Sequence, residues 1–193
     1  MTSGQASERS FRYRIDECDR ITFVCPNWLR FAAENASPEL TEAAVLGRPL
    51  WQYITDVNCS EIYRTLFSQI REHGVTATFP FRCDSPLIRR FMEMQISQLP
   101  HGHLQFDVQL VREEPQPYSP LLDPTIKRGD KWISMCAWCK RVRTPSDEWI
   151  DVSDALQTLG PFAERDIPNL THCICPPCNE VFLKSVRDSQ DQA

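Results

Sequence analysis

The feature that most constrains this chain is a pair of Cys-x-x-Cys motifs, Cys136 with Cys139 and Cys175 with Cys178. Two intervening residues let one turn of backbone direct both sulfur atoms at a single ion, and two such pairs supply a tetrahedral set of four. Four thiolates close the coordination shell and leave no position for water or substrate. We therefore predict that these four cysteines hold one structural zinc ion.

Other interpretations of the cysteines stay open at this stage. The pairs could form disulfides and release the metal as a redox switch, or hold an iron–sulfur centre. His172 and Cys173 lie just before the second pair, and either could replace one cysteine as a ligand. Because four well-spaced cysteines already fill the shell, we favour a position beside the ligands for both residues.

The remaining sequence agrees with a reducing compartment. The polar stretch Met1–Ser10 contains no apolar run of a secretory signal, and the nine cysteines are an odd number. No apolar run approaches the roughly 20 residues that cross a bilayer. We expect a cytoplasmic protein without a membrane anchor, in which thiols stay free and paired cysteines bind metal.

Charge argues against a large nucleic-acid interface. The net charge is -5, and neither part of the chain has the positive excess on which most nucleic-acid affinity depends. Lys140, Arg141 and Arg143 follow the first cysteine pair. They could contact phosphate, but we favour a role in offsetting the negative charge of a four-thiolate site, so nucleic acid is not a favoured partner.

In the first half of the chain, the spacing of apolar residues changes from strand-like to helix-like and back to strand-like. Alternating stretches on both sides of the polar turn 17–20 predict a β-hairpin. Short helices are predicted to begin at Pro26 and, with Ser37 as the N-cap, at the next residue. The longest helix is predicted to run from an Asn58 cap to Gly74.

Three strands follow, with regular alternation of apolar and polar residues between 75 and 110. Turns at 84–86 and 100–102 predict an antiparallel meander. Pro80 cannot donate a ladder hydrogen bond, so we expect an edge position or a bulge there. A sheet with one apolar face must be covered by the preceding helices, which gives an α+β fold.

These segments resemble the PAS domain, a sensory fold. The resemblance rests on the Asp16–Ile21 turn, the Val45–Leu50 stretch and the final meander, and it covers residues 11–113. It implies a PAS-like five-stranded antiparallel sheet with short helices. It also implies a sensing or dimerising role and a homodimer.

The prolines of residues 114–130 predict a stiff linker, and residues 131–188 would form the zinc module. A knuckle followed by a cysteine pair at a helix start resembles a treble-clef or ribbon-like module. With His172, the motifs also resemble a cysteine-rich tail of PAS proteins in bacterial signalling. That tail usually has His-Gly-Ile-Cys-Pro, whereas Cys173 replaces the glycine here.

The predicted interior is aromatic and rich in methionine, which is more typical of a packed core than of a ligand pocket. No flavin-binding Asn-Cys-Arg-Phe-Leu-Gln string occurs, and haem is not expected because His73, His101 and His103 lie at turns or a helix end. Cys59 and Cys83 fit small core residues. The residues predicted to line the interior are Trp28, Trp51, Phe67, Phe79, Phe81, Met92, Met94 and Phe106.

No catalytic constellation is evident in the sequence, so we do not expect an enzyme. The pattern favours a non-catalytic signalling or regulatory protein, in which the PAS-like half senses or dimerises and the zinc module docks a protein partner. One alternative is a transcription regulator that binds DNA through the zinc module. Another is a thiol redox sensor that uses Cys173.

Overall fold

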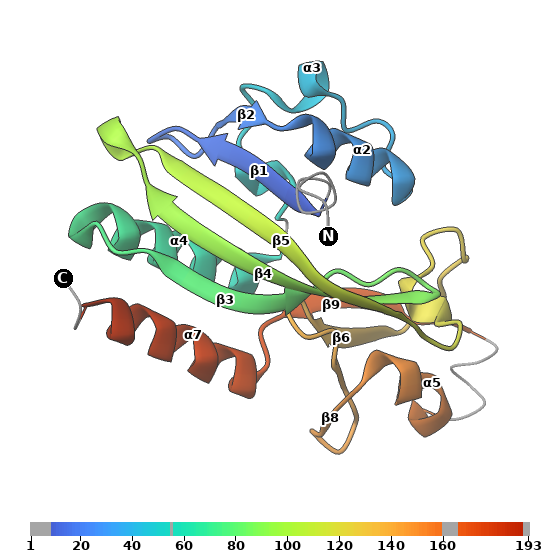
Figure 1. Cartoon of the computed structure of the whole chain (residues 1–193). Helices are drawn as coiled ribbons and strands as arrows, with labels where there is room; N and C mark the ends of the chain where they lie inside the picture. The colour runs from blue at the N-terminus through green and yellow to red at the C-terminus, as the bar shows by residue number, and fades with distance from the viewer. Residues whose placement is uncertain (1–8, 55, 160–165, 191–193) are drawn as a thin grey trace.

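The computed structural model describes residues 9–54, 56–159 and 166–190, and the predicted α+β architecture is confirmed (Figure 1). The first half contains β1 (Ser10–Ile15), β2 (Ile21–Val24), α2 (Pro26–Glu34), α3 (Glu42–Val45), the 3₁₀ turn η1 (Leu50–Gln52), α4 (Val57–His73), β3 (Ala77–Arg82), β4 (Ile88–Gln98), the 3₁₀ turn η2 (Pro100–Gly102) and β5 (Leu104–Pro115). Among the described helices, none combines the length and the apolar character that spanning a bilayer requires.

Within the described residues, the first half forms a five-stranded antiparallel sheet in the order β2-β1-β5-β4-β3. The predicted hairpin and meander are both present, and they join because β1 pairs with β5, Tyr13 opposite Phe106. Strand β3 lies at one edge of the sheet. Pro80 is therefore exposed on an edge strand, as predicted.

One face of the sheet is apolar, and α4 covers it. Phe67 of α4 is buried and meets Phe106 of β5 edge-on, with ring centroids 5.4 Å apart. Met94 and Ile96 of β4 are buried on the same face, whereas Gln95 between them is exposed. The alternation read from the sequence thus places the core correctly.

The polar turn between β1 and β2 is fastened to the helices by one aspartate. Asp19 adopts a left-handed conformation, with φ of 60°, which Asp tolerates better than most residues. Its carboxylate accepts a hydrogen bond from Trp51 Nε1 at 3.0 Å and pairs with Arg71 of α4 at 2.7 Å. The turn therefore fixes how α4 lies against the sheet.

Two predicted helix starts are wrong. Helix α3 begins at Glu42 with Thr41 as its N-cap, because the Thr41 side chain accepts from the amide of Ala44, and Ser37 lies in a preceding turn. Helix α4 is capped by Asp56, which accepts from the amide of Cys59 at 3.0 Å, so Asn58 is inside the helix.

The end of α4 follows the prediction. Gly74 has φ of 66° and its amide donates to the carbonyl of Ile70, as in a left-handed C-cap.

The proline-rich segment 114–130 is packed against the rest of the protein. Strand β5 continues through Pro115, which pairs with Ile88 of β4. Leu121, in the 3₁₀ turn η3 (Pro120–Leu122), is fully buried in a second apolar cluster. The domain boundaries that we drew at this segment stay a prediction, but these residues are not a free extended connector.

The second half builds a smaller sheet on that cluster. Its elements are β6 (Trp132–Cys136), β7 (Val142–Arg143), β8 (Trp149–Ile150), α5 (Val152–Leu159), β9 (Asn169–Cys173) and α7 (Pro176–Gln190). In the described part of the chain the strand order is β8-β7-β6-β9, and β6 and β9 are parallel. Helix α7 runs alongside β3, the edge of the larger sheet (Figure 1).

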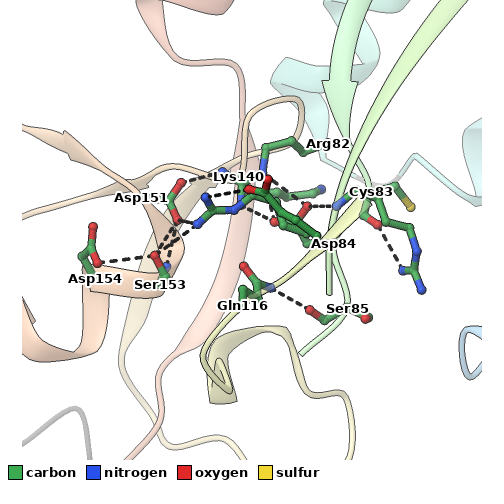
Figure 2. Close-up of polar contacts among 12 residues, drawn as sticks. Arg82, Cys83, Asp84, Ser85, Gln116, Lys140, Asp151, Ser153 and Asp154 are labelled. Carbon is green, nitrogen blue, oxygen red and sulfur yellow. Dashed lines mark hydrogen bonds and ion pairs between the residues drawn. The ribbon is translucent and has the colours of Figure 1, made fainter. Parts of the chain in front are cut away.

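An ion-pair network joins the two halves (Figure 2). Arg82 at the end of β3 pairs with Asp84, whose side chain is fully buried, and with Asp151 at 2.5 Å. Asp151 also accepts from the amide of Ser153 in the first turn of α5 and pairs with Arg89 of β4 at 3.1 Å. One carboxylate thus connects the start of α5 to two strands of the larger sheet.

We expect Arg82→Met to lower the free energy of unfolding by roughly 3–5 kcal/mol, because the buried carboxylate of Asp84 would lose its counter-charge. Denaturant unfolding of the metal-loaded protein measures this loss. Arg112→Met is the control, since the side chain of Arg112 is 60% exposed; it should cost less than about 1 kcal/mol. Equal losses in the two variants would contradict a structural role for the network.

Candidate metal centre

The structure brings the four predicted cysteines together. The sulfur atoms of Cys136, Cys139, Cys175 and Cys178 all lie within 4.8 Å of one another, and Cys136 and Cys175 are fully buried. This set can bind a metal ion. The cysteines arrive from segments far apart in the sequence, since β6 and β9 run side by side and end at the same place.

The first pair belongs to a knuckle at the end of β6. The amide of Cys136 donates to the carbonyl of Arg141 at 2.7 Å, and the amide of Lys140 donates to the carbonyl of Cys136 at 3.0 Å. Lys140 has φ of 60°, which completes the tight turn. The turn holds both sulfur atoms of the pair on one side of the backbone.

The second pair lies at the start of α7. Helix α7 begins at Pro176, and Pro177 lies in its first turn, where a missing amide hydrogen costs nothing. The amide of Cys175 also donates to the sulfur of Cys136 at 3.4 Å. Backbone N–H groups and the helix N-terminus therefore favour negative charge on these sulfur atoms.

Three of the four thiols, those of Cys136, Cys139 and Cys178, share protons unequally. The pKa of the Cys136 thiol is lowered because its sulfur accepts hydrogen bonds from the thiols of Cys139 and Cys178. The pKa of Cys139 is raised to about 12, and that of Cys178 is also raised, because each of these thiols donates toward Cys136. A thiophilic cation at the centre would take the place of these shared protons.

The spacing of the sulfur atoms fits a tetrahedral cation. Sulfur ligands about 2.3 Å from a zinc ion lie roughly 3.8 Å from one another in an ideal tetrahedron. The Cys139 and Cys175 sulfur atoms are 3.6 Å apart, close to that value. A disulfide would need a separation of about 2.05 Å. The set therefore fits a metal ligated by four cysteines.

Trp138, between the two cysteines of the knuckle, is inserted into the core of the larger sheet. Its ring stacks on Phe79 of β3, with centroids 4.4 Å apart and planes 15° from parallel. Its Nε1 donates to the hydroxyl of Tyr63 of α4 at 3.1 Å, and its carbonyl accepts from the amide of Arg82 at 2.5 Å. The side chain is buried, so the knuckle and the sheet share one apolar core.

His172 and Cys173 lie near the four cysteines but not among them. Both belong to β9, and the sulfur of Cys173 is 4.0 Å from the carbonyl oxygen of Met135. Burial raises the pKa of the Cys173 thiol to about 11, and burial lowers the pKa of His172. The position that we favoured for them, beside metal ligands, stays a prediction.

Two of the three basic residues after the knuckle make polar contacts within the protein. The ammonium of Lys140 turns back to the carbonyl of Ala137 at 2.9 Å, and Arg143 pairs with Asp147. Arg141 is exposed. Of the three cations, one is thus directed at the knuckle and one is engaged by a carboxylate.

The eight residues predicted for the interior are all part of the larger core. Five are buried and three are half-buried: Phe67, Phe79, Met92, Met94 and Phe106, then Trp28, Trp51 and Phe81. Among them, the ring of Phe67 lies tilted against Trp51 and edge-on to Phe106. His73 and His101 are exposed, and His103 pairs with Glu17 at 3.1 Å.

Sequence reasoning missed the Arg82 network, the role of Tyr63 and the insertion of Trp138. Arg82 is the last residue of β3, and a charged residue at the end of a strand is ordinarily expected to be exposed to solvent. A tryptophan between two metal-binding cysteines was the available signal, because so large an apolar side chain needs a core to enter.

Searches against protein-family models and against curated proteins found no match to this chain.

We expect the purified protein to contain one zinc ion per chain and no visible chromophore, as measured by elemental analysis and absorption spectroscopy. Cys175→Ser should abolish stoichiometric zinc, since it removes a buried ligand at the centre of the site. Cys18→Ser, at an exposed cysteine, is the control and should retain the metal. A folded wild-type protein without metal would refute the assignment.

A second expectation concerns Trp138. Trp138→Ala should destabilise the whole protein by about 3–5 kcal/mol, because it leaves a cavity beside Phe79 in the larger core. Zinc content should stay at one per chain, since tryptophan is not a ligand. Trp132→Ala, at a residue that is 65% exposed, should change stability by less than about 0.5 kcal/mol. Denaturant unfolding followed with elemental analysis checks both results.

Proposed function

We propose that this chain is a non-catalytic signalling or regulatory protein, in which a PAS-like half senses or dimerises and a zinc module presents a docking surface to a protein partner. The observation that carries the proposal is Trp138. Because its ring is stacked on Phe79 and its carbonyl is bonded to Arg82, a shift in the sheet must move the knuckle. A sensor and an output surface that share a packed core can be energetically coupled in this way.

The topology supports the PAS-like part of the proposal. Two strands, a set of short helices and a three-strand meander follow one another, and the hairpin lies beside the last strand. The face of the sheet opposite α4 is polar, with Arg12, Gln95 and Asp107 on neighbouring strands, and Arg12 pairs with Asp107. A homodimer that forms through this sheet and the N-terminal segment is part of the proposal.

The smaller sheet supports a treble-clef-like zinc module. A knuckle after β6, the β6–β7 pairing and a second cysteine pair that opens α7 give its parts in order. Zinc is the metal we propose because four cysteine sulfur atoms within 4.8 Å of one another suit it, and a closed shell suits a structural role.

The contacts favour this function over the two alternatives. Arg143 is paired with Asp147, and a net charge of -5 gives the protein little overall attraction for a DNA backbone. The Cys173 thiol, with its pKa raised to about 11 by burial, has little of the thiolate that a redox sensor needs. Among the residues that the structure describes, no contact specifically favours either alternative.

Hydrogen exchange tests the coupling on which the proposal depends. Removing zinc with a chelator should speed amide exchange in the module and also in β3 and β4, since Trp138 would lose its fixed position. Strand β2, at the opposite edge of the sheet, is the internal control and should change least. Faster exchange confined to residues 131–190 would show that the halves are independent, which contradicts the proposed function.

A further inference from the structure

A cleft opens where the knuckle meets the larger sheet. We call it the seam cleft; it has a volume of about 400 Å³ and is lined in part by Tyr53, Asp56, Phe81, Trp138, Lys140 and His172. This size is within the range of roughly 300–1,000 Å³ that is usual for small-molecule sites. Figure 2 shows Lys140 of the knuckle close to Arg82 and Cys83 at the sheet edge. The cleft thus exists only because the two halves are packed together.

The lining combines aromatic surface with two opposite charges. Tyr53 is exposed, Phe81 is half-buried, and both offer ring surface to a ligand. Arg82 also lines the cleft, but its guanidinium is already paired with Asp84 and Asp151. The charges that remain for a ligand are those of Asp56 and Lys140.

Both of these groups have hydrogen-bonding capacity left. The ammonium of Lys140 has three N–H donors and gives one to Ala137 O. The carboxylate of Asp56 can accept about four hydrogen bonds; it receives one from the amide of Cys59 and one from Thr171 Oγ1 at 3.3 Å. A donor cation and an acceptor anion therefore line the same cleft.

Several titratable groups with shifted pKa values also line the cleft. Burial raises the pKa of Cys59 to about 11 and also raises the pKa values of Cys83 and Tyr63, while burial and then the Lys140 charge lower the pKa of His172. These groups are uncharged at neutral pH. They add polar contacts without changing the charge balance, and such clustering is typical of functional sites.

We infer that the seam cleft binds a small zwitterionic amino acid with an apolar side chain. Its carboxylate meets Lys140, its ammonium group meets Asp56, and its side chain packs on the rings of Tyr53 and Phe81. A simple acid would meet the negative charge of Asp56, and a simple amine would meet the positive charge of Lys140. The two charges in the cleft therefore favour a ligand that carries both a carboxylate and an ammonium group.

This inference deepens the proposed sensing role, because it names the ligand class and places the site at the contact between sensor and output. A ligand bound there touches residues of both halves, Phe81 of the larger and Lys140 of the smaller. The apolar interior of the sheet, for which the sequence favoured a packed core over a ligand pocket, is lined by buried side chains of the core.

Isothermal titration calorimetry of the zinc-loaded full chain tests the inference, with L-phenylalanine and L-leucine as probes. We expect saturable binding of one amino acid per chain. 3-Phenylpropionate and 2-phenylethylamine, which lack one of the two charges, should bind at least tenfold more weakly than L-phenylalanine. This comparison uses only the wild-type protein, so no folding defect can account for it.

Two variants assign the contacts. Lys140→Met and Asp56→Asn should each weaken L-phenylalanine binding at least tenfold, and asparagine keeps the N-cap of α4 intact. The matched controls are Lys127→Met and Asp130→Asn at exposed positions outside the cleft, and both should bind normally. Zinc content and melting temperature, measured for every variant, establish that the site is folded.

The inference is overturned if neither amino acid binds at millimolar concentration. It is equally overturned if the acid or the amine binds as well as the amino acid, or if both cleft variants bind as the wild type does. These outcomes do not decide whether the proposed function is correct, because the hydrogen-exchange experiment measures the coupling between the halves without any ligand.

Discussion

The insertion of Trp138 is the contact on which the arrangement of the two halves depends. A knuckle is a small turn with almost no apolar interior, and its shape is held here by backbone hydrogen bonds. Trp138, which lies between the two cysteines of the knuckle, gives the turn one large apolar side chain. This side chain packs beside Phe79, so a residue of the smaller half completes the core of the larger sheet.

The same contact also covers an exposed sheet edge. Strand β3 would present unpaired backbone groups to solvent, and such edges favour aggregation. Pro80 removes one donor, the carbonyl of Trp138 pairs with the amide of Arg82, and α7 runs along the strand. Charge then reinforces backbone pairing, because Arg82 also pairs with Asp151 from the smaller half. The cysteine-rich segment is therefore part of the architecture of the sheet.

Local features of this chain could be predicted from its sequence. Cysteine spacing predicted the four-sulfur cluster, and alternation predicted the meander, because both follow from a few neighbouring residues. Helix starts were harder, since Asp56 and Asn58 are both good caps and only the tertiary position of α4 decides between them. The parallel pairing of β6 with β9 joins segments more than thirty residues apart, and no local pattern encodes such a pairing. The Arg82 network was missed for the same reason.

Metal binding and folding of the larger half should be linked in both directions. A ligand that binds only the native state adds its binding free energy to stability, and here the native state of the site includes a tryptophan packed in the neighbouring core. Anything that loosens Phe79 and Tyr63 around that ring also loosens the knuckle that aligns Cys136 and Cys139. A metal ion held by the four cysteines would therefore act on the rest of the protein through packing.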